Sequence, residues 1–253
     1  LWFPRLGMRG IQRLSLLDDV LVLSGSGVGG GSLVYANTLL EPHDEFFEDP
    51  QWRDITDWRA ELAPFYDTAR RMLGAVEADA TTPSDDVMRE IAARIGGSDT
   101  FRPTTIGVFR GEPGHRVPDP YFGGAGPDRV GCTQCGACMV GCRVGAKNTL
   151  DRNYLYLAEA GGAEVHAESE VVDLRREDGV WSVETRRPGG MTSRRRRTFT
   201  ADQVIVAAGA LGTTRLLLRL RDRGRLPGIS PTLGHVVRTN SESVVGAIAR
   251  SAK

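Results

Sequence analysis

The stretch GSGVGGGSLVYANTLLEP, residues 25–42, decides the fold class of this chain. Gly25, Gly27 and Gly30 satisfy the G-x-G-x-x-G dinucleotide pattern, which requires a following helix, a second strand and an acidic residue about 20 positions on. The chain instead becomes polar, and Pro42 stops regular structure. Five glycines in seven positions predict a backbone that lies flat against a large ligand with its amide groups exposed. The alternative is a glycine-rich surface turn.

Composition sets limits on the class of protein. At 253 residues the chain is long enough to bury a core. Lys plus Arg and Asp plus Glu number 32 each, so no overall field would recruit nucleic acid, and no nucleic-acid partner is expected. No apolar run reaches 18 residues, so no membrane-spanning segment is predicted. The arginine run 194–197 is expected to coat an exposed hairpin, the alternative being a functional basic patch.

Helical and alternating patterns predict a mixed chain. Helices are expected where apolar residues recur between capping residues: 58–73 with Asp57 as N-cap and Gly74 at its end, 84–95 opened by Ser84, 149–160, and 212–223. Strands are expected at 18–24 (buried), 163–167, 170–175, 180–186, 197–200 and 203–208, with an Asp178-Gly179 turn. Segments 41–57 and 110–129 are expected to be irregular.

The segment VIVAAGALGTTRLL, residues 204–217, is a predicted strand–turn–helix unit. It delivers Ala208 and Gly209 to the amino end of a helix, where unpaired amides and the helix dipole favour phosphate. Taken alone, the segment is also compatible with an ordinary α/β crossover.

The four cysteines of the chain form one short motif. Cys132, Cys135, Cys138 and Cys142 have the C-x₂-C-x₂-C-x₃-C spacing of bacterial ferredoxins, with Arg143 in place of the usual proline. The spacing predicts that they converge in one loop. An iron–sulfur cluster, a zinc ion and a metal-free structural loop all remain open at this point.

The linked motifs resemble one family. The loop GVGGGSLV (27–34), then GAKNTLDRNYLYLAEAGGAEVHAESEVVDL (145–174), IVAAGALGTTRLLLRLRDRGRLP (205–227) and LGHVVRTN (233–240) are similar in order and spacing to glucose–methanol–choline (GMC) oxidoreductases. Within the family, they are most similar to bacterial cholesterol oxidases. The resemblance covers about 230 residues. One departure is Tyr35, which stands where the family's flavin loop usually carries Asn or His.

The resemblance implies an α/β fold with α+β insertions, part of a Rossmann-like FAD-binding GMC fold with a β-meander and a substrate-side region. It divides the chain into a flavin-contact part (1–42), a substrate-side region (43–130), a Cys-rich loop (131–148) and an FAD-domain part (149–253). The cofactor is expected to be FAD, contacted by Gly27, Val28, Gly29, Gly30, Gly31, Ser32, Tyr35, Ala36, Asn37, Thr38, Val171, Ala208 and Gly209.

The implied reaction is hydride transfer from an alcohol carbon to the flavin, with a sterol among the candidate substrates and oxygen or an electron carrier as acceptor. The family's catalytic pair would lie beyond Lys253 and its dinucleotide fold before Leu1, so the chain is expected to be a central fragment without a catalytic residue. Of its histidines, His43, His115 and His166 are expected to be structural, and His235 to lie near the flavin.

Two other functions are compatible with the cysteine motif. One is a flavin dehydrogenase that passes electrons through a Cys-ligated cluster to a carrier. The other is a non-enzymatic iron–sulfur or zinc module in which the glycine loop is incidental. Cysteines at this spacing favour a reducing compartment, so a cytoplasmic location is expected.

Overall fold

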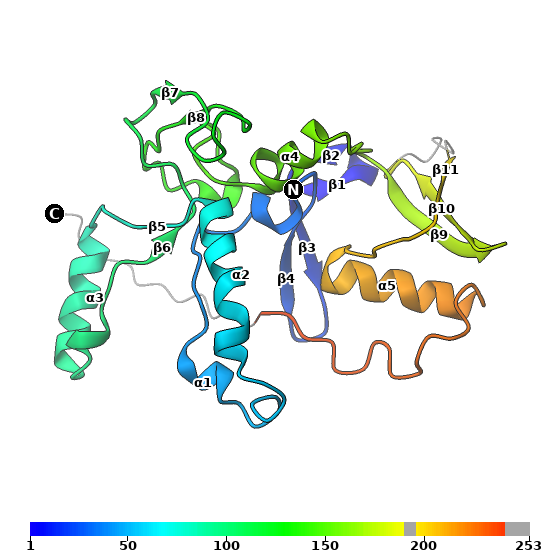
Figure 1. Cartoon of the computed structure of the whole chain (residues 1–253), viewed down its shortest axis with the longest axis horizontal. Helices are drawn as coiled ribbons and strands as arrows, with labels where there is room; N and C mark the ends of the chain where they lie inside the picture. The colour runs from blue at the N-terminus through cyan, green and yellow to red at the C-terminus, as the bar shows by residue number, and fades with distance from the viewer. Residues whose placement is uncertain (190–195, 241–253) are drawn as a thin grey trace. The chain divides into compact units, whose positions relative to one another are not determined.

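The computed structural model describes residues 1–189 and 196–240 (Figure 1). The chain divides into two compact units, Leu1–Ala167 and Glu168–Lys253, which are described separately. Among the described residues no helix combines the length and the apolar composition needed to cross a bilayer.

The first unit holds short antiparallel strand pairs, several 3₁₀ turns and four helices. Its strands are β1 (Trp2–Phe3), β2 (Met8–Arg9), β3 (Gln12–Leu16), β4 (Leu21–Gly25), β5 (Val76–Glu77), β6 (Thr105–Ile106), β7 (Arg116–Val117) and β8 (Arg129–Val130). Its helices are α1 (Asp44–Phe47), α2 (Trp58–Leu73), α3 (Pro83–Arg94) and α4 (Tyr154–Ala160), with 3₁₀ turns η1 (Pro4–Leu6), η2 (Gly30–Leu33), η3 (Ser98–Thr100), η4 (Cys138–Val140) and η5 (Leu150–Arg152).

The glycine loop follows a β-hairpin. The predicted strand 18–24 is β4, which pairs antiparallel with β3, a strand that the sequence analysis did not predict. Strand β4 was expected to be buried, and this prediction was wrong. The exposed fraction is 64% for Leu21 and 39% for Leu23. The glycine loop after β4 leads into η2, which is one turn of 3₁₀ helix, and not into an α-helix. The dinucleotide reading of residues 25–30 is therefore excluded, as the sequence analysis inferred.

Helix α2 has the predicted limits because its capping signals are local. The side chain of Asp57 accepts a hydrogen bond from the Ala60 amide, and Gly74 ends the helix in the left-handed conformation. Helix α3 starts one residue before the predicted Ser84, because Thr82 is its N-cap and forms a capping box with Asp85. Segment 41–57 was expected to be irregular, but it contains the four-residue helix α1.

The predicted helix 149–160 is broken. It divides into η5 and α4 at Asn153, whose φ of −134° and ψ of −100° are not helical. The side chain of Asn153 accepts a hydrogen bond from the Tyr154 amide and so caps α4. Segment 110–129 is largely irregular, as predicted, apart from β7 and the start of β8.

The second unit consists of the predicted β-meander and one helix: β9 (Glu170–Glu177), β10 (Val180–Arg186), β11 (Arg196–Ala201) and α5 (Gly209–Asp222). The strands lie in the order β11-β10-β9 and are antiparallel throughout. Val172 and Leu174 of β9 are buried, as is Leu220 of α5. Part of the predicted arginine run, residues 194 and 195, lies outside the described residues.

Two predicted strands are not formed. Residues 163–167 are coil and turn, and 203–207 are irregular with Ile205 91% exposed. Both segments have strand-like sequences, but a strand forms only when a neighbour receives its backbone hydrogen bonds. Within the described residues neither segment pairs with another strand. Helix α5 also begins earlier than predicted, at Gly209, with Ala208 as its N-cap.

Candidate cofactor site

The glycine loop turns back sharply on itself, in a geometry that requires glycine at several positions. At Gly25, the last residue of β4, an added Cβ would lie 2.1 Å from the carbonyl oxygen of Gly30. Gly29 and Gly30 have φ values of +104° and +54°, in the left-handed region that favours glycine. These positions therefore fix where the loop turns back on itself.

The loop has one open side. An added Cβ at Gly30 or Gly31 would meet no atom within 4 Å. Gly31 has no left-handed φ, so a side chain there would be unstrained and would only fill space. Val28 on the same loop is 37% exposed. The backbone of the loop is thus accessible to a large planar or phosphorylated ligand at Gly30 and Gly31.

Hydrogen bonds anchor the far end of the loop to residues 147–150. The hydroxyl of Ser32 donates to the carbonyl of Gly29 at 2.6 Å and accepts from the amide of Leu150 at 2.9 Å. The phenol of Tyr35 donates to the carbonyl of Asn148 at 3.1 Å. Burial, reinforced by the neighbouring Cys138, raises the pKa of Tyr35 well above its usual value, so the phenol stays protonated. The Tyr35 side chain therefore anchors the loop.

Lys147 joins the glycine loop to the cysteine loop. It is 1% exposed, and its ammonium donates to three carbonyls: Leu33 at 2.9 Å, Tyr35 at 3.1 Å and Cys138 at 2.7 Å. The ammonium also lies 4.7 Å from the centre of the Tyr35 ring. Burial lowers the pKa of Lys147, and the nearby sulfurs of Cys138 and Cys142 oppose that shift. All three protons of this buried cation are used to hold backbone.

Two buried polar atoms beside the loop have no partner among the described residues. They are Asn37 Oδ1 and Asp151 Oδ1. Asn37 has a left-handed φ of +62° and donates from Nδ2 to Cys138 Sγ at 2.9 Å. Asp151 Oδ1 would lie 3.4 Å from a Cβ added at Gly29. Unpaired buried acceptors are costly in a folded protein, so both oxygens are candidates to receive a donor from a bound ligand.

Two other residues of the loop were predicted to contact FAD. Ala36 and Thr38 are exposed, and Thr38 forms an isolated bridge with Ile106. Sequence reasoning missed Lys147 and Asp151 as site residues. Their only signal was the GAKNTLD motif, which carries no chemistry of its own without the loop against which it packs.

The predicted contacts of the second unit lie on two elements. Val171 is half-buried in β9, where it pairs with Thr185 next to a register shift. Gly209 is at the start of α5 with φ +73°, and an added Cβ there would meet nothing within 4 Å. The amide of Ala208 donates to Thr213 Oγ1 at 3.0 Å, so the helix start already satisfies one of its own amides.

The four cysteines line one pocket of about 200 Å³, together with Asn37 and other residues of the first unit. Three of the sulfurs accept N–H bonds: Cys132 from Gln134 at 3.4 Å, Cys142 from Lys147 at 3.4 Å, and Cys138 from Asn37. The predicted common loop is therefore confirmed.

A metal centre in this loop is not supported. Over the described ranges 1–189 and 196–240, no three Cys, His, Asp or Glu side chains are arranged to hold a metal ion. The hydrogen bonds to the sulfurs do not decide the matter, because metal-ligating sulfurs accept such bonds as well. Spacing brought the cysteines to one pocket but does not set the directions of their side chains.

One thiol is nevertheless activated. Burial opposes ionisation of Cys142, but the backbone amides of residues 144–147 surround its sulfur and lower its pKa below the usual thiol value. Hydrogen bonds to the charged form are the cause, as in other amide-lined anion sites.

The histidines have few catalytic features. His166 Nε2 lies 3.3 Å from the carboxylate of Glu164, whose side chain is 81% exposed. His43 is the N-cap residue of α1 without a side-chain capping bond. The His235 amide donates to the carbonyl of Thr232 at 2.9 Å. The prediction that His235 lies near the flavin stays a prediction.

Comparison with known proteins gives the family. Residues 126–220 match the GMC oxidoreductase family. The chain is 56% identical over 253 residues to a cholesterol oxidase of Mycobacterium tuberculosis (strain H37Rv). This match covers 98% of the chain and 44% of that protein. It is 41% identical over 256 residues to a cholesterol oxidase of Acinetobacter baumannii, which covers 97% of the chain and 46% of that protein. The chain spans less than half the length of these relatives. With its glycine loop and β-meander, it belongs to the GMC oxidoreductase family.

Proposed function

We propose that this chain forms part of an FAD-dependent oxidoreductase that oxidises a sterol alcohol. The observation that carries the proposal is the open backbone at Gly30 and Gly31 on a loop that buried contacts hold rigid. A planar cofactor needs such an approach, because side chains at these positions would keep it from the main chain. The relatives named cholesterol oxidase support the substrate class.

The chain's own residues would hold the cofactor in three ways. The missing side chains at Gly30 and Gly31 leave room for the ligand beside the main chain, while the amide of Gly30 is itself bonded to the carbonyl of Gly27 at 3.0 Å. Asn37 Oδ1 and Asp151 Oδ1 can each accept a hydrogen bond from a flavin N–H or a ribityl hydroxyl, which would satisfy buried atoms that have no partner among the described residues. Lys147 and Tyr35 hold the loop in place through hydrogen bonds to backbone carbonyls, and Tyr35 is also a proposed contact of the cofactor. FAD, when bound, supplies the two-electron chemistry.

In the second unit, Val171, Ala208 and Gly209 are proposed contacts for the same class of ligand. The absence of a Cβ at Gly209 leaves space at the amino end of α5, where the helix dipole favours an anionic group. Oxygen is the proposed electron acceptor. A route through the cysteine loop is not proposed, because among the described residues no three possible ligands are arranged to hold a metal.

The test uses the complete protein that contains this chain. Flavin absorbance after gel filtration should give about one FAD per polypeptide, and cholesterol should be oxidised with formation of hydrogen peroxide. A flavin-free protein would refute the cofactor assignment. A flavin-loaded protein that oxidises other alcohols but no sterol would refute the substrate class alone.

Gly31→Val separates cofactor binding from folding. The side chain would meet no protein atom and no unfavourable φ, so the variant should fold with an unchanged melting temperature in the apo form. It should lose most of its FAD, since the valine would occupy the proposed ligand space. Gly228→Val is the matched control, because Gly228 also has open space around it and lies outside the loop. Equal FAD content in both variants would contradict the proposal.

A further inference from the structure

The second unit has a pocket that the proposed cofactor contacts do not use. It measures about 220 Å³ and lies against β9, β10, β11 and α5, and its walls are rich in arginine: Val172, Asp173, Glu184, Arg186, Arg196, Arg219, Arg223 and Arg225. Five of these eight residues carry a guanidinium and two a carboxylate. Arg196 belongs to the arginine run that the sequence analysis treated as either a solvated face or a functional patch.

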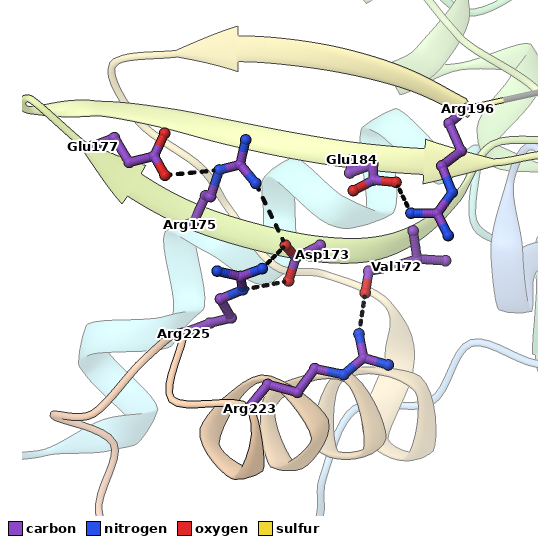
Figure 2. A network of polar contacts seen from close by, with 8 residues as sticks. All are labelled: Val172, Asp173, Arg175, Glu177, Glu184, Arg196, Arg223 and Arg225. Carbon is purple, nitrogen blue, oxygen red and sulfur yellow. Dashed lines mark hydrogen bonds and ion pairs between the residues drawn. The ribbon is translucent and has the colours of Figure 1, made fainter.

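Three of the five arginines are neutralised by neighbouring carboxylates. Arg225 binds both oxygens of the buried Asp173, each at 3.2 Å (Figure 2). Arg196 is paired with Glu184 on the neighbouring strand β10. Arg186 is bound by Glu170 at 3.0 and 3.3 Å. These three pairs leave little net charge of their own, so they build the wall of the pocket without creating a strong field.

The other two arginines have no carboxylate partner among the described residues. Arg223 reaches from α5 to the carbonyl of Val172 at 3.3 Å, which satisfies one N–H but leaves the charge unbalanced (Figure 2). The side chain of Arg219 has no hydrogen bond or ion pair among the described residues, and Arg219 precedes Arg223, the C-cap residue of α5, by four positions. Residues so spaced lie on one side of a helix about 6 Å apart, and two like charges there repel. The pocket thus holds two uncompensated positive charges next to each other.

We propose that this pocket binds a phosphate group. Two guanidinium forks side by side match the charge and the several acceptor oxygens of a phosphate dianion better than they match a single carboxylate. The volume is below the range of about 300–1,000 Å³ typical of drug-sized ligands, so the group inside is a phosphate or diphosphate, with the rest of its carrier outside. Arg219 lies in the last turn of α5 and Arg223 caps its carboxyl end, where the helix dipole does not attract anions, so the side chains alone supply the attraction.

Two carriers present this chemistry, a soluble phosphate ester and the head group of an anionic phospholipid. The test measures both on the complete, FAD-loaded protein. Inorganic pyrophosphate is titrated by calorimetry, and co-sedimentation is measured with phosphatidylcholine vesicles that do or do not contain phosphatidic acid. Binding of pyrophosphate alone identifies a soluble ester. Additional binding to the phosphatidic acid vesicles identifies a lipid head group.

The decisive variant is Arg219→Gln combined with Arg223→Gln. It should weaken binding of the successful probe at least about tenfold, because each charge-assisted contact is strong. The matched control, Arg215→Gln with Arg221→Gln, removes the same charge from the same helix at positions that do not line the pocket, and it should bind as the parent protein does. FAD content should be equal in all variants.

Three outcomes would overturn the proposal: no binding of either probe by the parent protein, an equal loss of binding in both double variants, or loss of FAD from the pocket variant. If the pocket variant fails to fold, Arg219→Gln alone replaces it, since that exposed residue has no side-chain hydrogen bond or ion pair among the described residues. It should still weaken the successful probe several-fold, and unchanged binding would refute the site.

Discussion

The ammonium of Lys147 is the best place to test how the cofactor loop is held. Replacement by methionine keeps the length and apolar stem of the side chain but removes the charge and its three protons. The carbonyls of Leu33, Tyr35 and Cys138 would then be buried without this donor. Lys147→Met should therefore loosen the glycine loop and the cysteine loop together.

The magnitude follows from two opposing terms. Each carbonyl that loses its donor costs about 1–3 kcal/mol, or about 3–9 kcal/mol for three. Removing a buried cation returns several kcal/mol of desolvation energy. With both terms included, the free energy of unfolding should fall by about 2–4 kcal/mol, slightly less than the about 3–5 kcal/mol lost when one partner of a buried ion pair is removed. Because the loop is the proposed flavin contact, FAD should also dissociate at a lower urea concentration.

The assay is urea denaturation of the complete protein, with tryptophan fluorescence reporting unfolding and flavin fluorescence reporting FAD release. Arg143→Met is the control, since it removes an exposed cation from the same loop and should change stability by less than about 0.5 kcal/mol. Lys147→Met with the same unfolding and FAD-release midpoints as Arg143→Met would show that the three hydrogen bonds do not hold the loop.

Three further changes probe other parts of the chain. Gly25→Ala should lower both the melting temperature and the FAD content, because its methyl group would collide with the carbonyl of Gly30 at 2.1 Å; a variant with normal FAD content would show that the return is not required. Asp119→Asn should destabilise the loop of residues 119–126 by about 1–3 kcal/mol, since the Asp119 carboxylate accepts hydrogen bonds from the amides of four residues in it. Faster limited proteolysis of the variant should report this loss. Burial opposes ionisation of Asp119, but those bonds lower its pKa, so this stabilisation should be present at neutral pH and disappear as the pH falls below the usual aspartate value; a pH-independent stability difference between the two proteins would contradict the reasoning. The Cys142 thiol should react with iodoacetamide with a pH midpoint below about 8.5, as followed by mass spectrometry, and a midpoint above that value would refute its activation.

Local signals in the sequence were sufficient for several elements. Helix 58–73 was predicted with correct limits because Asp57 and Gly74 act within one turn of the helix ends. The Asp178-Gly179 turn was predicted because both residues tolerate the left-handed conformation, and they adopt φ values of 52° and 85°. In both cases the stabilising contacts are made between residues close in sequence.

Long-range pairing decided the elements that failed. The segment 203–208 has a strand-like sequence but stays irregular, because no neighbouring strand within the described chain forms backbone hydrogen bonds with it. Strand β3 went unpredicted because residues 12–16 read as a strand only once β4 lies beside them. The spacing of the cysteines predicted a shared loop correctly, but the donors that contact their sulfurs include a remote residue, Asn37, which is 101 positions from Cys138.

The sequence by itself determined the glycine-rich loop, the β-meander and the family, because these depend on residue types at fixed local spacing. Only the tertiary structure decided which residues hold the loop and where charge remains unbalanced. Lys147 contacts Leu33 across 114 positions, and Arg219 and Arg223 differ from the neutralised arginines only in lacking a carboxylate nearby in space. Such features depend on burial and on distances between remote segments, which the order of residues along the chain does not contain.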